Sequence, residues 1–232
     1  MWQSKNKAIT FSFDDGVRQD IRVIEILDKY GLKGTFNLNS GKFGTKNPYE
    51  TDGRTVERDI IEPQEVKEIY KDHEVAVHTL GHFNLTELTE SCVIWQVEED
   101  RKNLERLTGK AVRCMAYPCG GVNNDERTAG IIREKTEIKF ARTTTSSYSF
   151  DLKSDLIRFS PTVRIHDKKL FSLAEEFISL KAETPKLFYI WSHSYEFDDE
   201  DGLWERFEEF CKFISRKDDI FYGTNGEVFF GR

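Results

Sequence analysis

The 232-residue sequence predicts an α/β chain folded as a distorted, incomplete (β/α) barrel of about seven parallel strands, similar to a TIM barrel. Two observations lead to this prediction. Short apolar segments alternate with amphipathic ones along the whole chain, and no repeat or linker divides it, which favours one domain over residues 1–232. Hydrophobic residues make up 38% of the chain and include 18 phenylalanines, enough for one substantial core.

The first part of the chain gives the clearest pattern. Residues 8–13 are predicted as a buried strand. Residues 17–30 place apolar side chains at helical spacing and stop at Gly31, which predicts a helix. Residues 33–38 form the next predicted strand. The Gly-, Asn- and Lys-rich stretch 39–60 is predicted as a long excursion, and loops of that length in compact domains often form functional rims.

The later segments continue the alternation of strand and helix. Pro63 falls in the first turn of a helix that ends near Lys71, and a strand is predicted at 75–78. A long amphipathic helix follows, whose apolar face carries Val93, Val97, Leu104 and Leu107. Further strands are predicted at 111–116, 140–143, 157–163 and 187–191, and further helices at 126–136, 168–182 and 203–216.

The net charge of the chain, its hydropathy and its first residues restrict the partners and the location that we expect for it. The net charge of −7 disfavours a nucleic-acid partner, because phosphate contacts need clustered cations. No apolar run approaches a membrane span. Residues 1–7 lack the apolar core of a secretory signal, so the chain as written is expected in the cytoplasm, although a trimmed secreted chain would look the same. The oligomeric state is left open.

Two adjacent carboxylates, Asp14 and Asp15, follow the first predicted strand directly. Such a pair is costly to bury unless a metal ion, a cationic partner or helix N-terminal amides stabilise its charge. The simpler alternative is that one of the two caps the helix that begins near Val17. The pair alone leaves a metal site and a helix cap equally open.

Two histidines four residues apart strengthen the metal interpretation. A turn or tight loop at the spacing of His78 and His82 can direct both imidazoles at one ion, although an isolated pair of this kind is more often structural. Chemistry in (β/α) folds gathers where the strands end. Asp14, Asp15, His78 and His193 all follow predicted strands, so we expect them to share one site.

Four segments resemble the motifs of the polysaccharide deacetylases, the NodB-homology family also called carbohydrate esterase family four (CE4). They are PheSerPheAspAspGly at 11–16, GluValAlaValHisThrLeuGlyHis at 74–82, TyrProCysGlyGly at 117–121 and LeuPheTyrIleTrpSerHis at 187–193. Their order and separation also match, and the resemblance covers about residues 8–195. It implies hydrolysis of N- or O-acetyl groups on a polysaccharide, an oligosaccharide or a small amino sugar.

The resemblance also implies a metal centre and its chemistry. Asp15, His78 and His82 would bind one divalent ion, with zinc expected and cobalt, nickel or iron left open by these ligand types. Asp14 would be the general base toward a metal-activated water, and His193 would protonate the leaving group. For His193, a satisfied core histidine at a strand end is the alternative.

Three further residues would contact the substrate by the same resemblance. The backbone N–H of Cys119 would stabilise the oxyanion, and Tyr117 belongs to the same motif. Trp191 would form an apolar wall against the acetyl methyl group, although a buried strand aromatic is the simpler reading.

Motifs three and four depart from the family pattern. Complete members have an Arg shortly before the Pro of motif three that steadies the base, whereas Ala116 occupies the matching position. Arg113 or Arg142 could replace it, although Arg113 is more simply a solvated residue at a strand start. The acidic residue and Trp of motif four are not evident after Asp125. Two alternatives therefore stay open: a hydrolase of a non-carbohydrate amide or cyclic imide, and a catalytically weak protein that binds metal and carbohydrate.

Overall fold

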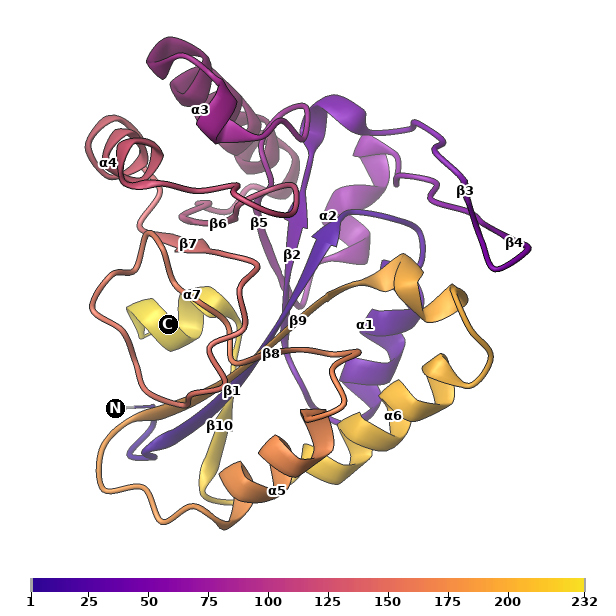
Figure 1. Cartoon of the computed structure of the whole chain (residues 1–232), viewed down its shortest axis with the longest axis vertical. Helices are drawn as coiled ribbons and strands as arrows, with labels where there is room; N and C mark the ends of the chain where they lie inside the picture. Colours follow the sequence, from indigo (N-terminus) through magenta and orange to yellow (C-terminus); the bar gives the residue numbers. More distant parts are fainter. Residues whose placement is uncertain (1, 232) are drawn as a thin grey trace.

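A computed structural model describes residues 2–231 and contains an eight-stranded, all-parallel sheet that curls with helices on its outside (Figure 1). Its strands are β1 (Lys7–Asp15), β2 (Gly34–Leu38), β5 (Glu74–Val77), β6 (Cys114–Ala116), β7 (Phe140–Arg142), β8 (Val163–Arg164), β9 (Lys186–His193) and β10 (Ile220–Tyr222). Seven strands follow one another in the order β7-β6-β5-β2-β1-β9-β8, and β10 pairs with β1 beside this path. The predicted distorted, incomplete (β/α) barrel is therefore confirmed.

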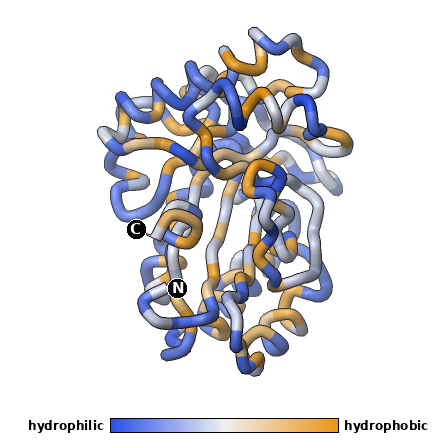
Figure 2. Tube along the Cα trace, turned by 90° about the vertical axis from the view of Figure 1, so that its left-hand side faces the viewer, coloured by the Kyte–Doolittle hydropathy of each residue, from blue (hydrophilic) through white to orange (hydrophobic). Residues whose placement is uncertain are grey.

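Helices follow most of the strands and carry their apolar sides against the sheet. They are α1 (Asp20–Lys29), α2 (Val66–Ile69), α3 (Glu90–Thr108), α4 (Glu126–Lys135), α5 (Leu170–Ser179), α6 (Leu203–Ile214) and α7 (Asn225–Phe230), with the 3-10 turns η1 (Ser40–Lys42), η2 (Pro63–Glu65), η3 (Leu85–Glu87) and η4 (Ser194–Asp198). Figure 2 shows apolar stretches along the central strands and polar ones on the outer helices and loops. Among the described residues, no helix has the length and apolarity needed to cross a membrane.

Strand β1 lies at the centre of the sheet and pairs with three others. Strand β9 pairs along most of its length, β2 pairs with its second half, and β10 pairs with its first three residues. All nine residues of β1 are buried, as expected of a parallel strand covered on both faces. The register places Asp14 opposite His193 on one side and Asn37 on the other.

Aromatic side chains fill the space between β1, β2 and the helices α1 and α6. Phe13 stacks on Phe36 with ring centroids 5.5 Å apart, and Phe207 of α6 meets Phe13 edge-on at 6.1 Å. Tyr70 lies on the other side of Phe36, 5.0 Å from its ring. These rings form the part of the hydrophobic core that packs against β1 and β2.

Three parts of the chain differ from the sequence prediction. The excursion 39–60 contains an antiparallel hairpin made of β3 (Tyr49–Thr51) and β4 (Arg54–Val56). The last strand β10 and the helix α7 were not predicted, and each has six residues or fewer. The strand predicted at 157–163 is mostly irregular, because only its end joins β8.

The irregular segment before β8 nevertheless brings the two ends of the sheet together. The N–H of Phe159 donates to Ala141 in β7 at 2.9 Å, and the Phe159 carbonyl accepts from Thr143. Three residues later, the N–H of Thr162 donates to Tyr189 in β9 at 2.9 Å. The gap between β7 and β9 is thus bridged by a few backbone hydrogen bonds of an irregular segment rather than by a regular strand, which leaves the barrel incomplete.

Candidate active site

The carboxyl ends of β1, β5 and β9 surround a cavity of about 320 Å³. The residues predicted from sequence all line it: Asp14, Asp15, His78, His82, Tyr117, Cys119, Trp191 and His193. The first two end β1, His78 follows β5 and His193 ends β9, so the parallel strands deliver side chains that lie far apart in the sequence to one edge of the sheet.

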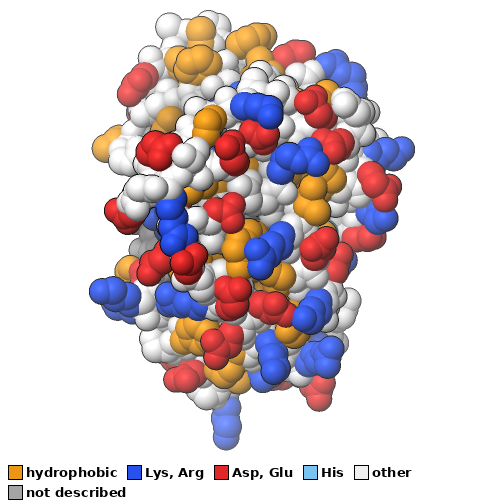
Figure 3. Space-filling view, turned by 90° about the vertical axis from the view of Figure 1, so that its right-hand side faces the viewer, with side chains coloured by type: hydrophobic (Ala, Val, Ile, Leu, Met, Phe, Trp, Pro, Cys, Tyr) orange, Lys and Arg blue, Asp and Glu red, His pale blue; other side chains and the backbone are white. Residues whose placement is uncertain are grey.

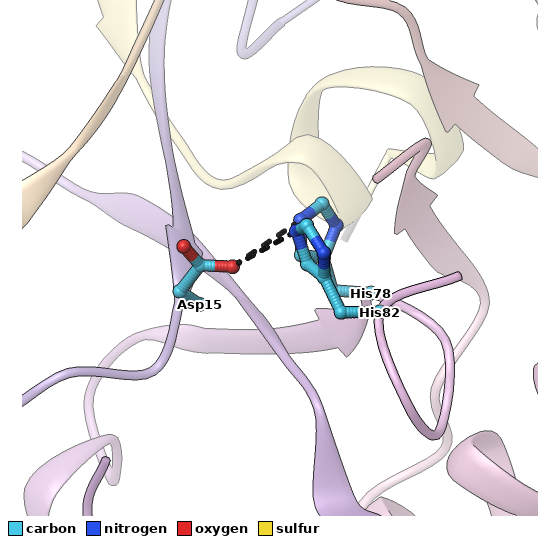
Figure 4. A group of neighbouring side chains, drawn as sticks. All are labelled: Asp15, His78 and His82. Atoms are coloured by element: carbon cyan, nitrogen blue, oxygen red, sulfur yellow. Dashed lines mark ion pairs between the residues drawn. The ribbon is translucent and has the colours of Figure 1, made fainter. Parts of the chain in front are cut away.

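Asp15, His78 and His82 point toward one another across this cavity (Figure 4). Asp15 Oδ1 lies 3.6 Å from His78 Nε2 and 3.3 Å from His82 Nε2, and the three potential ligand atoms all lie within 4.8 Å of one another. Oδ1 is buried and has no hydrogen-bond partner among the described residues. A carboxylate oxygen in that situation is costly unless a cation compensates it.

The surroundings of the two imidazoles favour their neutral form. His78 Nδ1 lies 2.9 Å from the carbonyl oxygen of Ala116, so this nitrogen carries the hydrogen and Nε2 presents its lone pair to the cavity. Burial lowers the pKa of His78, and burial together with the His78 imidazole lowers the pKa of His82 to about 4. One carboxylate and two neutral imidazoles fit a divalent ion of the zinc type.

Left-handed backbone conformations cluster in the loops around this cavity. Asp15, Thr79, His82 and Cys119 have φ angles of 82°, 66°, 60° and 69°. Such conformations are unfavourable for non-glycine residues and persist where surrounding contacts hold them. Here the Asn39 amide donates to the carbonyl of Thr79 at 2.8 Å, which helps to hold the loop between the two histidines.

A buried arginine holds the carboxylate of Asp14. Arg142 Nη2 lies 2.5 Å from both carboxylate oxygens, and the Asn37 amide donates to Oδ1 at 2.8 Å. Burial acts to raise the pKa of Asp14, but the charges of Arg142, His78 and His193 outweigh it, so the pKa lies below its usual value. Of the two arginines considered as replacements for the family's motif-three Arg, the structure places Arg142 on Asp14.

The other candidate, Arg113, is exposed just before β6 and has no contact with the cavity. Arg142 instead ends β7, the neighbouring strand, and its guanidinium also lies 4.6 Å from the Trp191 ring. In this chain the guanidinium beside Asp14 therefore comes from the end of β7, whereas the motif-three segment 117–121 follows β6.

The polar and aromatic stretch 195–198 can be interpreted from sequence either as a cluster that binds sugar or supports the site or as a surface turn, and Glu196 is the member that reaches His193. Its Oε1 lies 2.8 Å from His193 Nδ1, and Oε2 accepts from the Ser192 hydroxyl at 2.9 Å. Burial acts to lower the pKa of His193, but the hydrogen bond and charge of Glu196 raise it to about 9. His193 is therefore held protonated. Within that stretch the sequence alone does not distinguish Glu196 from Asp198, because the distinction depends on the turn η4.

The remaining predicted residues line the cavity in different ways. The Tyr117 hydroxyl donates to the carbonyl of Ile157 at 2.9 Å, so it is committed to the core. The Asn123 amide donates to the Cys119 carbonyl at 2.8 Å and fixes the turn that presents Cys119. Trp191 is 6% exposed, and its Nε1 has no hydrogen-bond partner within residues 2–231.

Comparison with known proteins identifies a family for this chain and solved structures with a similar fold. The polysaccharide deacetylase family model matches residues 3–132. A polysaccharide deacetylase from Bacillus cereus is 21% identical over 64% of this chain and 44% of its own, with a TM-score of 0.51. This chain thus spans less than half of that structure. No curated protein matches in sequence.

Two other solved structures align with nearly the whole chain. The Xyl-CE4 domain of a multidomain xylanase from the hindgut metagenome of Trinervitermes trinervoides is 15% identical over 97% of this chain and 91% of its own, with a TM-score of 0.60. A CE4-family pseudoenzyme from Bacillus anthracis is 16% identical over 96% of this chain and 65% of its own, with a TM-score of 0.56. At these identities the likeness establishes a shared fold.

Proposed function

The chain belongs to the polysaccharide deacetylase family, and from this premise we propose that it is a metal-dependent hydrolase that removes acetyl groups from a carbohydrate. The observation that carries the proposal is the contact between Arg142 and Asp14. It supports an ionised base beside a possible metal site, although the usual arginine is missing. Asp15, His78 and His82 would hold the ion.

The side chains of the cavity divide the chemistry between them. A divalent ion, with zinc favoured by the ligand types, would supply Lewis acidity and lower the pKa of a water molecule. Asp14 would accept the proton of the attacking water, because Arg142 keeps its carboxylate ionised at neutral pH. The N–H of Cys119 would donate to the oxyanion, and Trp191 would contact the acetyl methyl group.

His193 would supply the proton that the leaving amine or alcohol needs. Its Nδ1 is engaged by Glu196, which leaves Nε2 to act toward the substrate. The raised pKa of His193 keeps the imidazolium populated at neutral pH, while the lowered pKa of Asp14 keeps the base unprotonated. Two groups whose environments move their pKa values apart in this way suit acid and base roles.

Acetate release from a panel of acetylated sugars and oligosaccharides tests the proposal. We would compare zinc-loaded protein, chelated protein, Asp14→Asn and His78→Ala. Release that requires metal and collapses in both variants is expected. Metal binding with sugar affinity but no acetate would instead identify a non-catalytic relative. Release from small amides or cyclic imides alone would redirect the substrate class, and failure to bind metal would overturn the mechanism.

A further inference from the structure

Two cations lie at the edge of the metal cavity without an acidic partner. Arg58 lines both the cavity of about 320 Å³ and an adjoining hollow of about 150 Å³, and Lys42 lines the hollow. Asp15 and His82 border both spaces, so the hollow continues directly from the metal ligands. Within residues 2–231, neither Arg58 nor Lys42 forms an ion pair with an Asp or Glu.

The position of Arg58 is fixed by its surroundings. Its guanidinium lies 5.1 Å from the rings of both Tyr49 and Tyr195, and its Nε donates to the carbonyl of Asn47 at 3.0 Å. A guanidinium has five N–H donors, and the contacts of Arg58 with the Asn47 carbonyl and with the Tyr195 side chain engage only part of them. The remaining donors are available to a ligand.

The β3–β4 hairpin, labelled in Figure 1, precedes Arg58 and is anchored by side-chain contacts. Arg54 forms two hydrogen bonds of 2.8 Å with the carboxylate of Asp201, and the Tyr49 hydroxyl donates to Asp199. Arg58 is therefore presented to the cavity by a segment docked on the chain that follows η4.

Three cations line the two spaces, and one of them, Arg164, is paired with Glu196, which leaves Arg58 and Lys42 without an acidic partner among the described residues. Apart from Asp14 and Asp15, the Lys, Arg, Asp and Glu side chains lining the two spaces are Arg58, Arg164 and Lys42. The whole chain is acidic, with a net charge of −7, and Figure 3 shows both signs interspersed over one outer face. A cationic lining in an acidic chain attracts anions into the cavity.

We propose that Arg58, with Lys42 beside it, binds an anionic group of the substrate, so that the acetylated carbohydrate carries a carboxylate or phosphate close to its acetyl group. The inference rests on the proposed function, because it names the substrate class of the same cavity. Guanidinium groups match the geometry of carboxylates and phosphates. The competing explanation is that Arg58 only anchors its loop, in which case its charge would not discriminate between sugars.

Binding to zinc-loaded Asp14→Asn protein tests this without turnover. Calorimetry would compare N-acetylglucosamine, N-acetylmuramic acid, which adds a carboxylate, and N-acetylglucosamine 6-phosphate. We expect at least one anionic sugar to bind about tenfold to a hundredfold more tightly than the neutral one, the range for a hydrogen bond to a charged group, and the difference to shrink at high salt. The anionic sugar that gains affinity identifies the group.

Substitutions then assign the effect to residues. Arg58→Gln and Lys42→Gln should reduce the preference for the anionic sugar and leave the neutral one unchanged, while Arg58→Lys should keep part of it. Arg54→Gln is the matched control, because it removes a charge from the same hairpin away from the cavity. Equal affinity for all three sugars, no binding of either anionic sugar, or an equal loss for all sugars in Arg58→Gln would overturn the inference.

Acetate release is measured separately, with protein that retains Asp14, so that failure of the anion site can be distinguished from failure of the deacetylase proposal. Release without any preference for anionic sugars would overturn the anion site and leave the deacetylase proposal standing. An anion preference that Arg58→Gln abolishes, without acetate release from any sugar, would refute the deacetylase proposal and retain the anion site.

Discussion

Replacing Glu196 with Gln should lower the alkaline limit of activity. Glu196 contacts His193 Nδ1 at 2.8 Å and is the main reason why the pKa of His193 rises from 6.5 to about 9 against the effect of burial. Gln keeps an oxygen that can accept the hydrogen bond but removes the charge. Because burial, the largest single effect, is then opposed only by the weaker effects of Asp15 and Asp14, the pKa of His193 should fall from about 9 to 6.5 or lower.

The pH dependence of kcat/KM for acetate release measures this shift. With His193 acting as the acid, a fall of its pKa from about 9 to about 6.5 predicts a loss of activity of about 30-fold at pH 8 and almost none at pH 6. Glu200→Gln, an exposed neighbour, should leave the profile unchanged. An equal loss at both pH values, or an unmoved alkaline limb in folded protein, would refute the coupling of Glu196 to an acid at His193.

Three further substitutions test other parts of the structure. Arg142→Gln should raise the pKa of Asp14 and move the acidic limb of the same profile to higher pH. It should also lower the free energy of unfolding in urea by about 3–5 kcal/mol, because a buried carboxylate loses its partner. Arg113→Gln, the control, should change neither the pH profile nor the unfolding free energy. His78→Ala should lower zinc affinity more than tenfold in competition with a chelator, as loss of a ligand predicts. His73→Ala should retain zinc, because His73 contacts Asp28 instead. Equal zinc binding by the two variants would disprove the proposed ligand set. Phe36→Ala should cost about 3–5 kcal/mol in urea unfolding, since its buried ring packs between Phe13 and Tyr70; a loss below 1 kcal/mol, the size of a surface substitution, would contradict this packing.

The sequence predicted the elements that are buried on one or both faces. Strands β1 and β9 appear as continuous apolar runs because helices and other strands cover them, and α6 is strongly amphipathic. The β3–β4 hairpin was not predicted, because its strands are short and mostly exposed and therefore show no alternation of apolar and polar residues. Its turn, Asp52-Gly53, was a usable signal.

The candidate site also contains residues that the sequence could predict and residues that it could not. Asp14, Asp15, His78 and His82 could be proposed from adjacency and spacing, which are local properties of the chain. Arg142 could only be named as one of two candidates, because 128 positions separate it from Asp14 and the curl of the sheet brings them together. Glu196 depends on the turn η4, which orients its carboxylate back toward His193.

The pairing of β1 on both edges has a consequence for how the molecule opens. Amide hydrogens of this strand should exchange with solvent only through global unfolding, so Asp14 and Asp15 keep their places until the fold is lost. The β3–β4 hairpin, with two strands of three residues and Val56 as its single buried strand residue, can open locally at much lower free energy. Sequence changes in the hairpin would then act on the rim that presents Arg58, while Asp14 and Asp15 stay in register with β2 and β9.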